Sequence, residues 1–275
     1  MTAKRQKLCL FSAAIVPPLI VLFLPAVNQA LFTELIRTAN PWLAFLRMVG
    51  LPAVVSVAAV CLLHSKRSRP YAWALCISAL LCAAAAFGAV AYQRLRFNSA
   101  FFEAAINGMG YIILALGAIL ASLVQAVFLY VSKPKAQTPC KTKNALCAVF
   151  VLLLGPALVL LVSALSEKLF YIANRSFNMW YSILTVSLPV FFFCTAIVFL
   201  CHVPKTKLVL AAHAVSMLVV LTLALCSFFG FGITAHLFHS LRVNFQIFYQ
   251  LCAYVFFANA ANLVFCALSL KRRPA

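Results

Sequence analysis

Long apolar segments separated by short polar links run along the whole chain. An α-helix needs about 20 mainly apolar residues to cross the hydrocarbon core of a bilayer. Eight such segments can be marked, near residues 8–27, 43–63, 71–91, 108–131, 145–165, 181–201, 208–231 and 247–268. The pattern therefore predicts an all-α fold, a polytopic transmembrane helix bundle of eight spans, and the short links leave no room for a soluble domain.

One sequence pattern occurs twice, at an offset in the numbering of 175 − 37 = 138. The pattern L-F-x4-R-x2-N-x-W runs over residues 31–42 and again over residues 169–180. The same offset pairs other identical residues: Leu8 with Leu146, Cys9 with Cys147, Pro18 with Pro156, and His64 with His202. We interpret the chain as two four-helix repeats, residues 1–137 and 138–275. Since four spans is an even number, both repeats enter the membrane from the same side and are parallel.

The composition indicates that lipid surrounds the chain. Hydrophobic residues make up 66% of it and charged residues 9%, whereas soluble domains carry about 25% charged residues. With both termini inside, 15 of the 22 Lys and Arg residues fall on the inner side, as the positive-inside rule requires. We therefore expect a multi-pass protein of the cell membrane with both termini cytoplasmic. The net charge of +19 follows from topology and does not indicate nucleic-acid binding.

Acidic residues are scarce, and their scarcity excludes several classes of chemistry. The chain has no Asp, and its three Glu residues, Glu34, Glu103 and Glu167, all lie in links predicted to face outward. Metal–phosphate sites usually need a carboxylate, and many proton relays in transporters use intramembrane Asp or Glu. We therefore expect no resident metal, no cofactor and no carboxylate-based proton pump.

The repeated motif supplies the first group of candidate binding residues. Its arginines offer a planar fork of donors that suits phosphate or carboxylate groups. Two related forks could bind one anionic headgroup or solute on the outer side. The candidate residues are Arg37, Asn40, Arg175, Asn178, Arg96 and Arg242. Alternatively, these residues only orient the helices, by capping short interfacial helices and by pairing with Glu34 or with lipid phosphates.

Polar residues inside the predicted spans form the second group. Gln125, Asn259 and Asn262 could line a polar seam between the two repeats. Alternatively, they form ordinary hydrogen bonds between helices, which contribute little free energy. His64 and His202 end their predicted helices, where the helix dipole favours a cation. We interpret them as helix-end residues and predict no metal site.

Three functional classes stay open on this pattern. The favoured class is a permease or flippase-like transporter for an anionic or amphipathic solute, with its site between the repeats. The alternative is a non-catalytic membrane subunit or scaffold that docks a partner membrane protein or a second copy of the chain. A membrane enzyme that modifies lipid headgroups is disfavoured by the lack of Asp and of intramembrane carboxylates.

Overall fold

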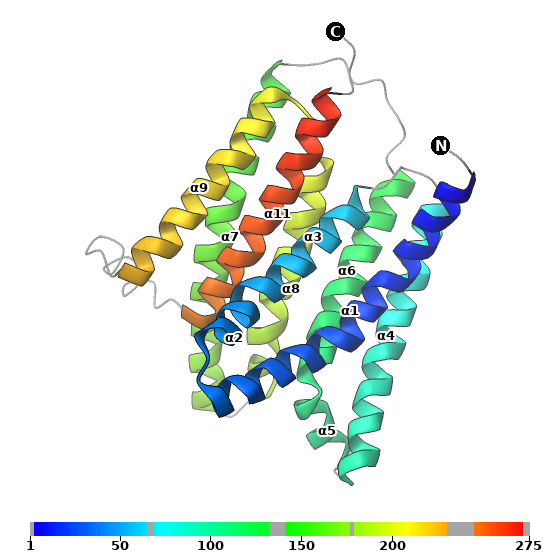
Figure 1. The fold of residues 1–275 in the computed structure, drawn as a ribbon, viewed down its shortest axis with the longest axis vertical. Helices are drawn as coiled ribbons and strands as arrows, with labels where there is room; N and C mark the ends of the chain where they lie inside the picture. Colours follow the sequence, from blue (N-terminus) through cyan, green and yellow to red (C-terminus); the bar gives the residue numbers. More distant parts are fainter. Residues whose placement is uncertain are drawn as a thin grey trace. The chain divides into compact units, whose positions relative to one another are not determined.

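The chain folds into α-helices. The computed structural model describes residues 3–64, 69–98, 100–131, 141–176, 179–229 and 245–271. Within these ranges all regular secondary structure is helical, and no strand occurs in them (Figure 1). The all-α prediction is confirmed.

Seven helices in the described ranges are long and apolar enough to cross a membrane. The predicted sixth span coincides with α8 (Met179–His202), in which Ser187–His202 forms a shorter apolar segment. The chain is a multi-pass, membrane-spanning helical protein by these criteria. A total of eight spans stays a prediction.

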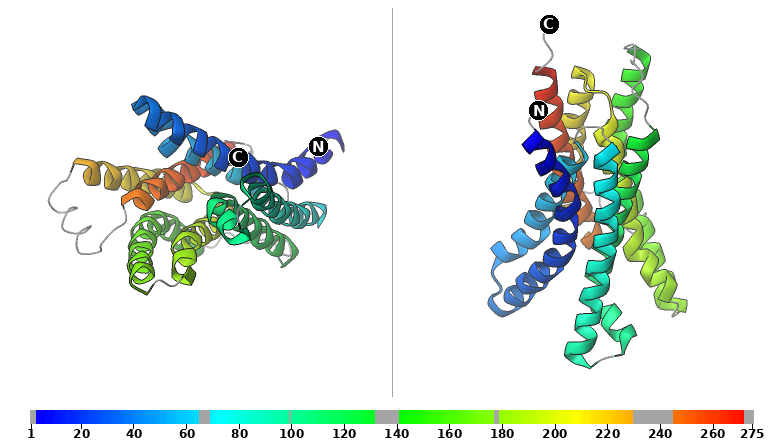
Figure 2. Two further views of the ribbon diagram at one scale, coloured as in Figure 1. Left: turned by 90° about the horizontal axis from the view of Figure 1, so that it is seen from below. Right: turned by 90° about the vertical axis from the view of Figure 1, so that its right-hand side faces the viewer.

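The first compact unit, unit 1, comprises Met1–Arg47 and Ser65–Pro134. Its helices are α1 (Ala3–Thr38), α2 (Pro41–Phe45), α4 (Arg69–Phe97), α5 (Phe101–Asn107) and α6 (Met109–Val131). α4 packs along α1 and α6, and Figure 2 shows the short α5 turning back at the end of α4. Small buried residues such as Ala13, Ala72 and Ala126 let these helices approach closely.

The second compact unit, unit 2, comprises Met48–His64 and Lys135–Ala275. Its helices are α3 (Leu51–Leu63), α7 (Lys141–Ser176), α8, α9 (Lys207–Phe229) and α11 (Phe245–Lys271). α7 packs against α8 and α9, while α11 packs against α9, α3 and α7. The Ser56 hydroxyl of α3 donates to the Tyr254 carbonyl of α11 at 3.0 Å. α3 is therefore part of unit 2, although α4 of unit 1 follows it in the chain.

A short turn connects α1 to α2, and Arg47 contacts α1 just after α2. Arg47 lies in η1 (Leu46–Gly50), a turn of π-helix between α2 and α3. Its Nε donates to Asn28 Oδ1 of α1 at 2.9 Å, and its guanidinium lies 4.6 Å from the centre of the Phe32 ring. These contacts fix α2 against α1 within unit 1.

α1 continues to Thr38, well beyond residue 27, where the predicted first span ends. Residues 28–38 contain neither Gly nor Pro, so nothing in them interrupts the helix. Glu34 and Arg37 also pair at the i,i+3 spacing that stabilises a helix. The helix stops at Ala39, whose φ of 49° is the left-handed conformation typical of a helix end.

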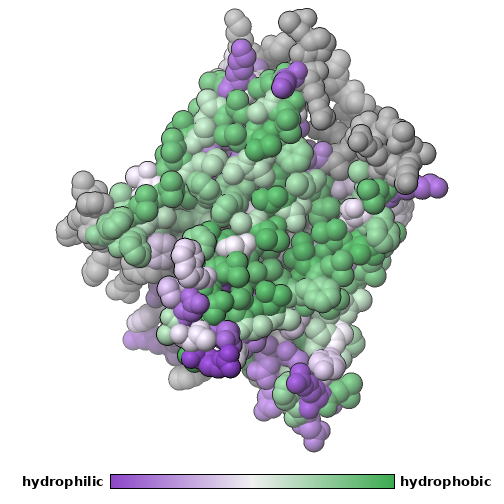
Figure 3. All heavy atoms as spheres, viewed as in Figure 1, coloured by the Kyte–Doolittle hydropathy of each residue, from purple (hydrophilic) through white to green (hydrophobic). Residues whose placement is uncertain are grey.

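Large apolar side chains cover the outer faces of the helices. Examples that are more than 60% exposed are Phe11, Leu80, Phe87, Leu95, Leu161 and Leu218. In Figure 3, apolar residues cover the visible helix surfaces and hydrophilic residues gather near helix ends. Soluble proteins rarely expose contiguous apolar surface on this scale, so the exposed faces fit a lipid environment.

Candidate functional site

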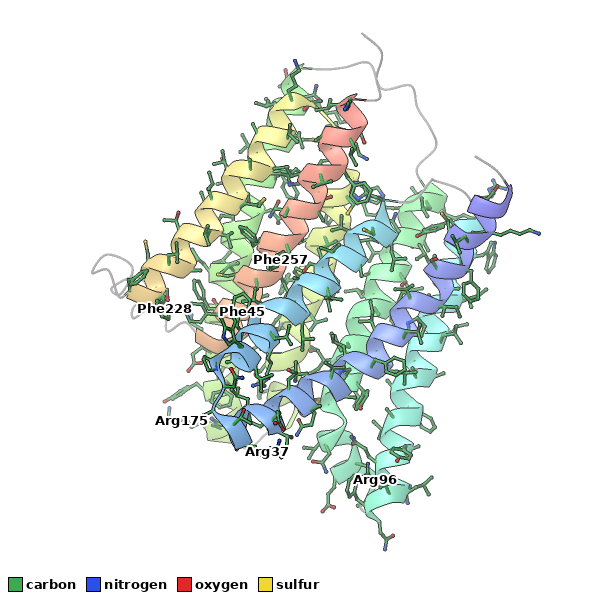
Figure 4. The ribbon with its side chains drawn as sticks, in the orientation of Figure 1. Arg37, Phe45, Arg96, Arg175, Phe228 and Phe257 are labelled. Carbon is green, nitrogen blue, oxygen red and sulfur yellow. The ribbon has the colours of Figure 1, made fainter. Side chains whose placement is uncertain are left out.

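Arg37 and Asn40 both make local contacts at the end of α1, where Figure 4 labels Arg37. Arg37 Nη2 donates to Glu34 Oε1 at 2.7 Å, and the Arg37 side chain is 75% exposed. Asn40 is the N-cap of α2, and its Oδ1 accepts a hydrogen bond from the Trp42 backbone N–H at 3.0 Å. These contacts are the ones that the helix-orienting interpretation requires. Anion binding by the two residues stays a prediction.

The other arginines of the predicted outer cluster lie at helix ends. Arg175, near the end of α7 in unit 2, lies 5.7 Å from the centre of the Tyr171 ring. Arg96, near the end of α4 in unit 1, lies 5.3 Å from the centre of the Phe97 ring. The remaining two members, Asn178 and Arg242, lie outside the described residues. A pair of arginine forks around one anion therefore stays a prediction.

The three residues of the predicted polar seam are all buried, but they belong to two units. Gln125 lies on α6 in unit 1, whereas Asn259 and Asn262 lie on α11 in unit 2. The amide nitrogens of Asn259 and Asn262 donate to the carbonyls of Val255 and Ala258, at 3.0 and 2.9 Å. A seam between the repeats stays a prediction, while the two asparagines form part of a polar cluster inside unit 2.

His213 on α9 completes this polar cluster, and the sequence interpretation did not select it. Its side chain is only 1% exposed, and its Nδ1 lies 2.7 Å from Asn259 Oδ1. The amide nitrogen of Asn259 donates to the Val255 carbonyl. This hydrogen bond assigns the orientation of the amide, in which Oδ1 faces His213. A carbonyl oxygen can only accept, so Nδ1 carries the proton and Nε2 keeps a lone pair in the neutral ring.

A small pocket lies beside this pair in unit 2, where α8 ends. Its lining residues are His64, Leu200, Cys201, Val203, Pro204, Lys205, Val209, His213, Asn262 and Cys266. α3, α8, the α8–α9 connection, α9 and α11 all contribute to the lining. The space is of the order of one water molecule.

His64 ends α3 and forms one wall of the pocket. Its Nδ1 lies 3.2 Å from the Val60 carbonyl oxygen, and its ring stacks on Phe265 with centroids 4.4 Å apart. Since the carbonyl only accepts, Nδ1 carries the proton and Nε2 is the remaining acceptor. Burial and the nearby Lys205 ammonium lower the pKa of His64 to about 4. The ring is therefore neutral at neutral pH.

His202 makes the same local contact as His64 but lies outside the pocket lining. Its Nδ1 is 2.7 Å from the carbonyl oxygen of Val198, four residues earlier. His64 and Val60 precede His202 and Val198 by the offset that separates the two copies of the repeated motif. The two histidines therefore share their backbone contact and differ in access to the pocket.

The two thiols that line the pocket both donate hydrogen bonds. Cys201 Sγ donates to Asn262 Oδ1 at 3.5 Å, and Cys266 Sγ donates to the Thr206 carbonyl at 3.7 Å. Within the described residues, no group of three or more His, Cys, Asp or Glu side chains is arranged to hold a metal ion. The pocket chemistry is therefore that of two imidazole acceptors and one ammonium group.

The electrostatic environment of the pocket is positive. Glu167 is the single acidic residue in the sequence of unit 2, and none of the described residues that line the pocket carries a carboxylate. Such a site can hold a small polar species that accepts a hydrogen bond from Lys205 and donates to an imidazole. Comparison of the chain with protein-family models, with curated proteins and with solved structures finds no match.

Proposed function

We propose that the chain is a permease or flippase-like transporter for an anionic or amphipathic solute. The buried pair of His213 and Asn259 is the observation that carries this proposal. His213 lies within α9, one of the helices long and apolar enough to span a membrane. An ionisable side chain at such a position is costly in free energy, and residues of this kind commonly mark solute or proton pathways.

The transporter would consist of two parallel four-helix repeats with eight spans. The repeat offset supports this arrangement, because it relates the backbone contacts of His64 and His202. It also relates the buried positions of α4 and α9. In the positive-inside arrangement, both termini lie in the cytoplasm and the protein lies in the cell membrane.

Transport can be measured with the purified protein in proteoliposomes. The probes are formate, chloride, phosphate and a fluorescent anionic phospholipid, each followed against empty vesicles of the same lipid. We expect the wild-type protein to accelerate movement of at least one probe. His213→Leu should abolish this acceleration, whereas the matched variant His202→Gln should retain it. Equal rates for all probes with and without the protein would overturn the proposal.

The outer arginine cluster has its own test in the same assay. If Arg37 and Arg175 bind one anionic group together, Arg37→Gln and Arg175→Gln should each slow transport, and the double variant should be no slower than the worse single variant. Full transport by either single variant would show that the arginines only orient the helices.

A non-catalytic membrane subunit is the second candidate function. It is favoured by the contacts of Arg37 with Glu34 and of Asn40 with Trp42, because residues that serve the helix ends need no solute. A tagged chain that purified from its native membranes in a fixed ratio with a second membrane protein, and that moved no probe in vesicles, would support this alternative.

A further inference from the structure

We propose that one water molecule in the pocket of unit 2 bridges Nε2 of His64 and Nε2 of His213 and passes a proton from the first ring to the second. The inference rests on the proposed transporter function and names the proton as its coupling ion. The ligand has the size that the pocket admits, because a space of about 10 Å³ fits one water molecule and nothing larger.

The two histidines of the pocket both offer an acceptor to a water molecule. Nδ1 of His64 carries the proton that faces the Val60 carbonyl, so Nε2 is the acceptor that this ring offers to the pocket. The same holds for His213, whose Nδ1 faces Asn259 Oδ1. A water molecule has two O–H donors, one for each Nε2.

Asn262 supplies a donor for the oxygen of the water. Its Nδ2 donates one hydrogen to the Ala258 carbonyl at 2.9 Å, and a side-chain amide nitrogen carries two. Since Asn262 lines the same pocket, its second N–H is available to the water. The water would then make three hydrogen bonds, which is about the usual number for a buried water molecule.

The two histidines differ in their access to solvent, which gives the relay its direction. His64 ends α3 and is half-buried, whereas His213 lies within α9 and is only 1% exposed. A proton from the surrounding water therefore meets His64 first. The bridging water extends the path to the buried ring, and acid–base groups in proteins commonly act through one water molecule.

The transfer consists of proton steps that leave the pocket water unchanged. A proton from the solvent forms the Nε2–H bond of His64. This bond breaks as the proton moves to the water oxygen, and one O–H bond of the water breaks as its proton forms Nε2–H on His213. His64 and the water end neutral, and His213 becomes an imidazolium whose Nδ1–H donates to Asn259 Oδ1. Because hydrogen bonds from a charged donor are the stronger ones, Asn259 stabilises the product.

Titratable groups from every neighbouring element surround the two rings. They are Cys61 on α3, Cys201 and His202 on α8, Lys205 in the α8–α9 connection and Cys266 on α11. The thiols of Cys201 and Cys266 already donate hydrogen bonds, and an ammonium group has no acceptor. Imidazole is the side chain that takes up and releases protons near neutral pH. The two imidazoles that line the pocket are therefore the groups that can pass a proton between them.

The relay is tested by proton movement into proteoliposomes that hold a trapped pH-sensitive dye. The purified full-length chain is reconstituted, and potassium with valinomycin carries the compensating charge. The outside is then made more acidic, first without a probe and then with chloride or phosphate. We expect vesicles with the protein to acidify faster than empty vesicles of the same lipid. Equal rates under all conditions would overturn the proposal.

Two pairs of variants distinguish the relay from general leakage. Val209→Ile adds a methylene group to the pocket lining and should exclude the water, whereas Val220→Ile makes the same change at a buried position of α9 outside the lining. His64→Gln keeps a polar side chain that cannot pass a proton, and His202→Gln makes this change outside the pocket. Val209→Ile and His64→Gln should each slow the protein-dependent proton movement by at least about tenfold, and the two controls should not. An unchanged rate in His64→Gln would contradict the relay.

A measurement on the wild-type chain keeps the test decisive if Val209→Ile or His64→Gln does not fold. In nanodiscs, nuclear magnetic resonance cross-peaks should connect a bound water with the Cε1–H protons of both His64 and His213. The absence of these cross-peaks would overturn the proposal.

The outcomes also distinguish this inference from the proposed function. Transport of a probe without any accompanying proton movement would contradict the relay and leave the transporter proposal standing. Proton movement that is lost in Val209→Ile, with no transport of any probe, would support the relay and contradict the transporter proposal.

Discussion

The helices α4 and α9 bury the same positions in two different units, but α9 buries a histidine where α4 buries a leucine. α4 packs against α1 and α6, and α9 packs against α7 and α11. Each buried residue of α9 has a buried counterpart at the repeat offset: Val209 with Tyr71, Ala212 with Ala74, His213 with Leu75, Ser216 with Ser78, and Val220 with Cys82. The burial pattern thus specifies which face of each helix packs. The difference between Leu75 and His213 changes the chemistry of that face.

The helices that pack against α4 and α9 also differ in the polar residues that they bury. α6 buries Ser122 and Gln125, three residues apart, and α11 buries Asn259 and Asn262 at the same spacing. The asparagine of unit 2 provides an acceptor for His213 at 2.7 Å. A polar group in a membrane-embedded core is tolerated when its partner is present, so the histidine and the amide are best understood as one hydrogen-bonded pair.

The largest effect should come from placing a histidine at Leu75 in the core of unit 1. Leu75→His removes a buried aliphatic side chain and puts an imidazole into a site that is packed for leucine. We expect the free energy of unfolding to fall by roughly 3 kcal/mol, measured by unfolding of the detergent-solubilised protein. Adding Ser122→Asn supplies an amide at the position that corresponds to Asn259 when Gln125 is aligned with Asn262, and it should recover part of the loss. A neutral Leu75→His would contradict the comparison.

The reverse change should be smaller. His213→Leu leaves Asn259 Oδ1 buried without its donor, and Asn259→Leu leaves the His213 N–H without its acceptor. Each should lower the free energy of unfolding by roughly 1–3 kcal/mol. The double variant should lose less than the sum, because it removes both halves of the contact, with a coupling energy of about 1 kcal/mol. Strictly additive losses would show that the hydrogen bond contributes nothing.

Two glycines should respond in opposite directions. A Cβ at Gly155 of α7 would lie 2.7 Å from Ser216 Oγ and 3.0 Å from Val255 Cγ1, whereas a Cβ at Gly88 of α4 meets nothing within 4 Å. Gly155→Ala should therefore lower the free energy of unfolding by about 1–2 kcal/mol. Gly88→Ala should raise it by about 0.5 kcal/mol, because alanine has the higher helix propensity. Equal effects in thermal unfolding would mean that α7 and α9 have room to separate.

The pH dependence of stability should follow His64. Its pKa is lowered from 6.5 to about 4 in the folded chain, so folding disfavours the protonated ring. The contribution is constant above pH 6.5 and is lost as the pH falls from 6.5 toward 4. We expect a loss of about 1 kcal/mol at pH 5 after solvent screening. His64→Gln should reduce this acid sensitivity, whereas His202→Gln should keep it.

The smallest effect should be at the outer ion pair of unit 1. Glu34 and Arg37 form an exposed pair, and such pairs contribute at most about 0.5 kcal/mol at an i,i+3 spacing. Glu34→Gln should therefore leave the unfolding temperature almost unchanged. A large loss of stability would show that the pair has a role beyond the surface of α1.

The helices could be predicted from the sequence because lipid-facing and packed positions both demand apolar residues over a fixed length. The helix-end roles of Arg37 and Asn40 could also be predicted, since caps and i,i+3 pairs depend on local spacing. The membership of α3 in unit 2 could not, because it depends on which distant helix α3 packs against. The signal for His213 was present in the sequence, as a histidine that replaces Leu75 at the repeat offset, but its partner became evident only from the packing of α9 on α11.

The position of α3 has a consequence for biogenesis. α3 ends at Leu63, and its main packing neighbour, α11, begins at Phe245, so the ribosome makes every helix from α4 to α9 between the two. At ribosomal rates of about 5–20 residues per second, synthesis of this intervening chain takes roughly 10–40 s. During that interval lipid or the insertion machinery must shield the packing face of α3. Unit 2 can therefore complete the packing of α3 only after α11 has been synthesised.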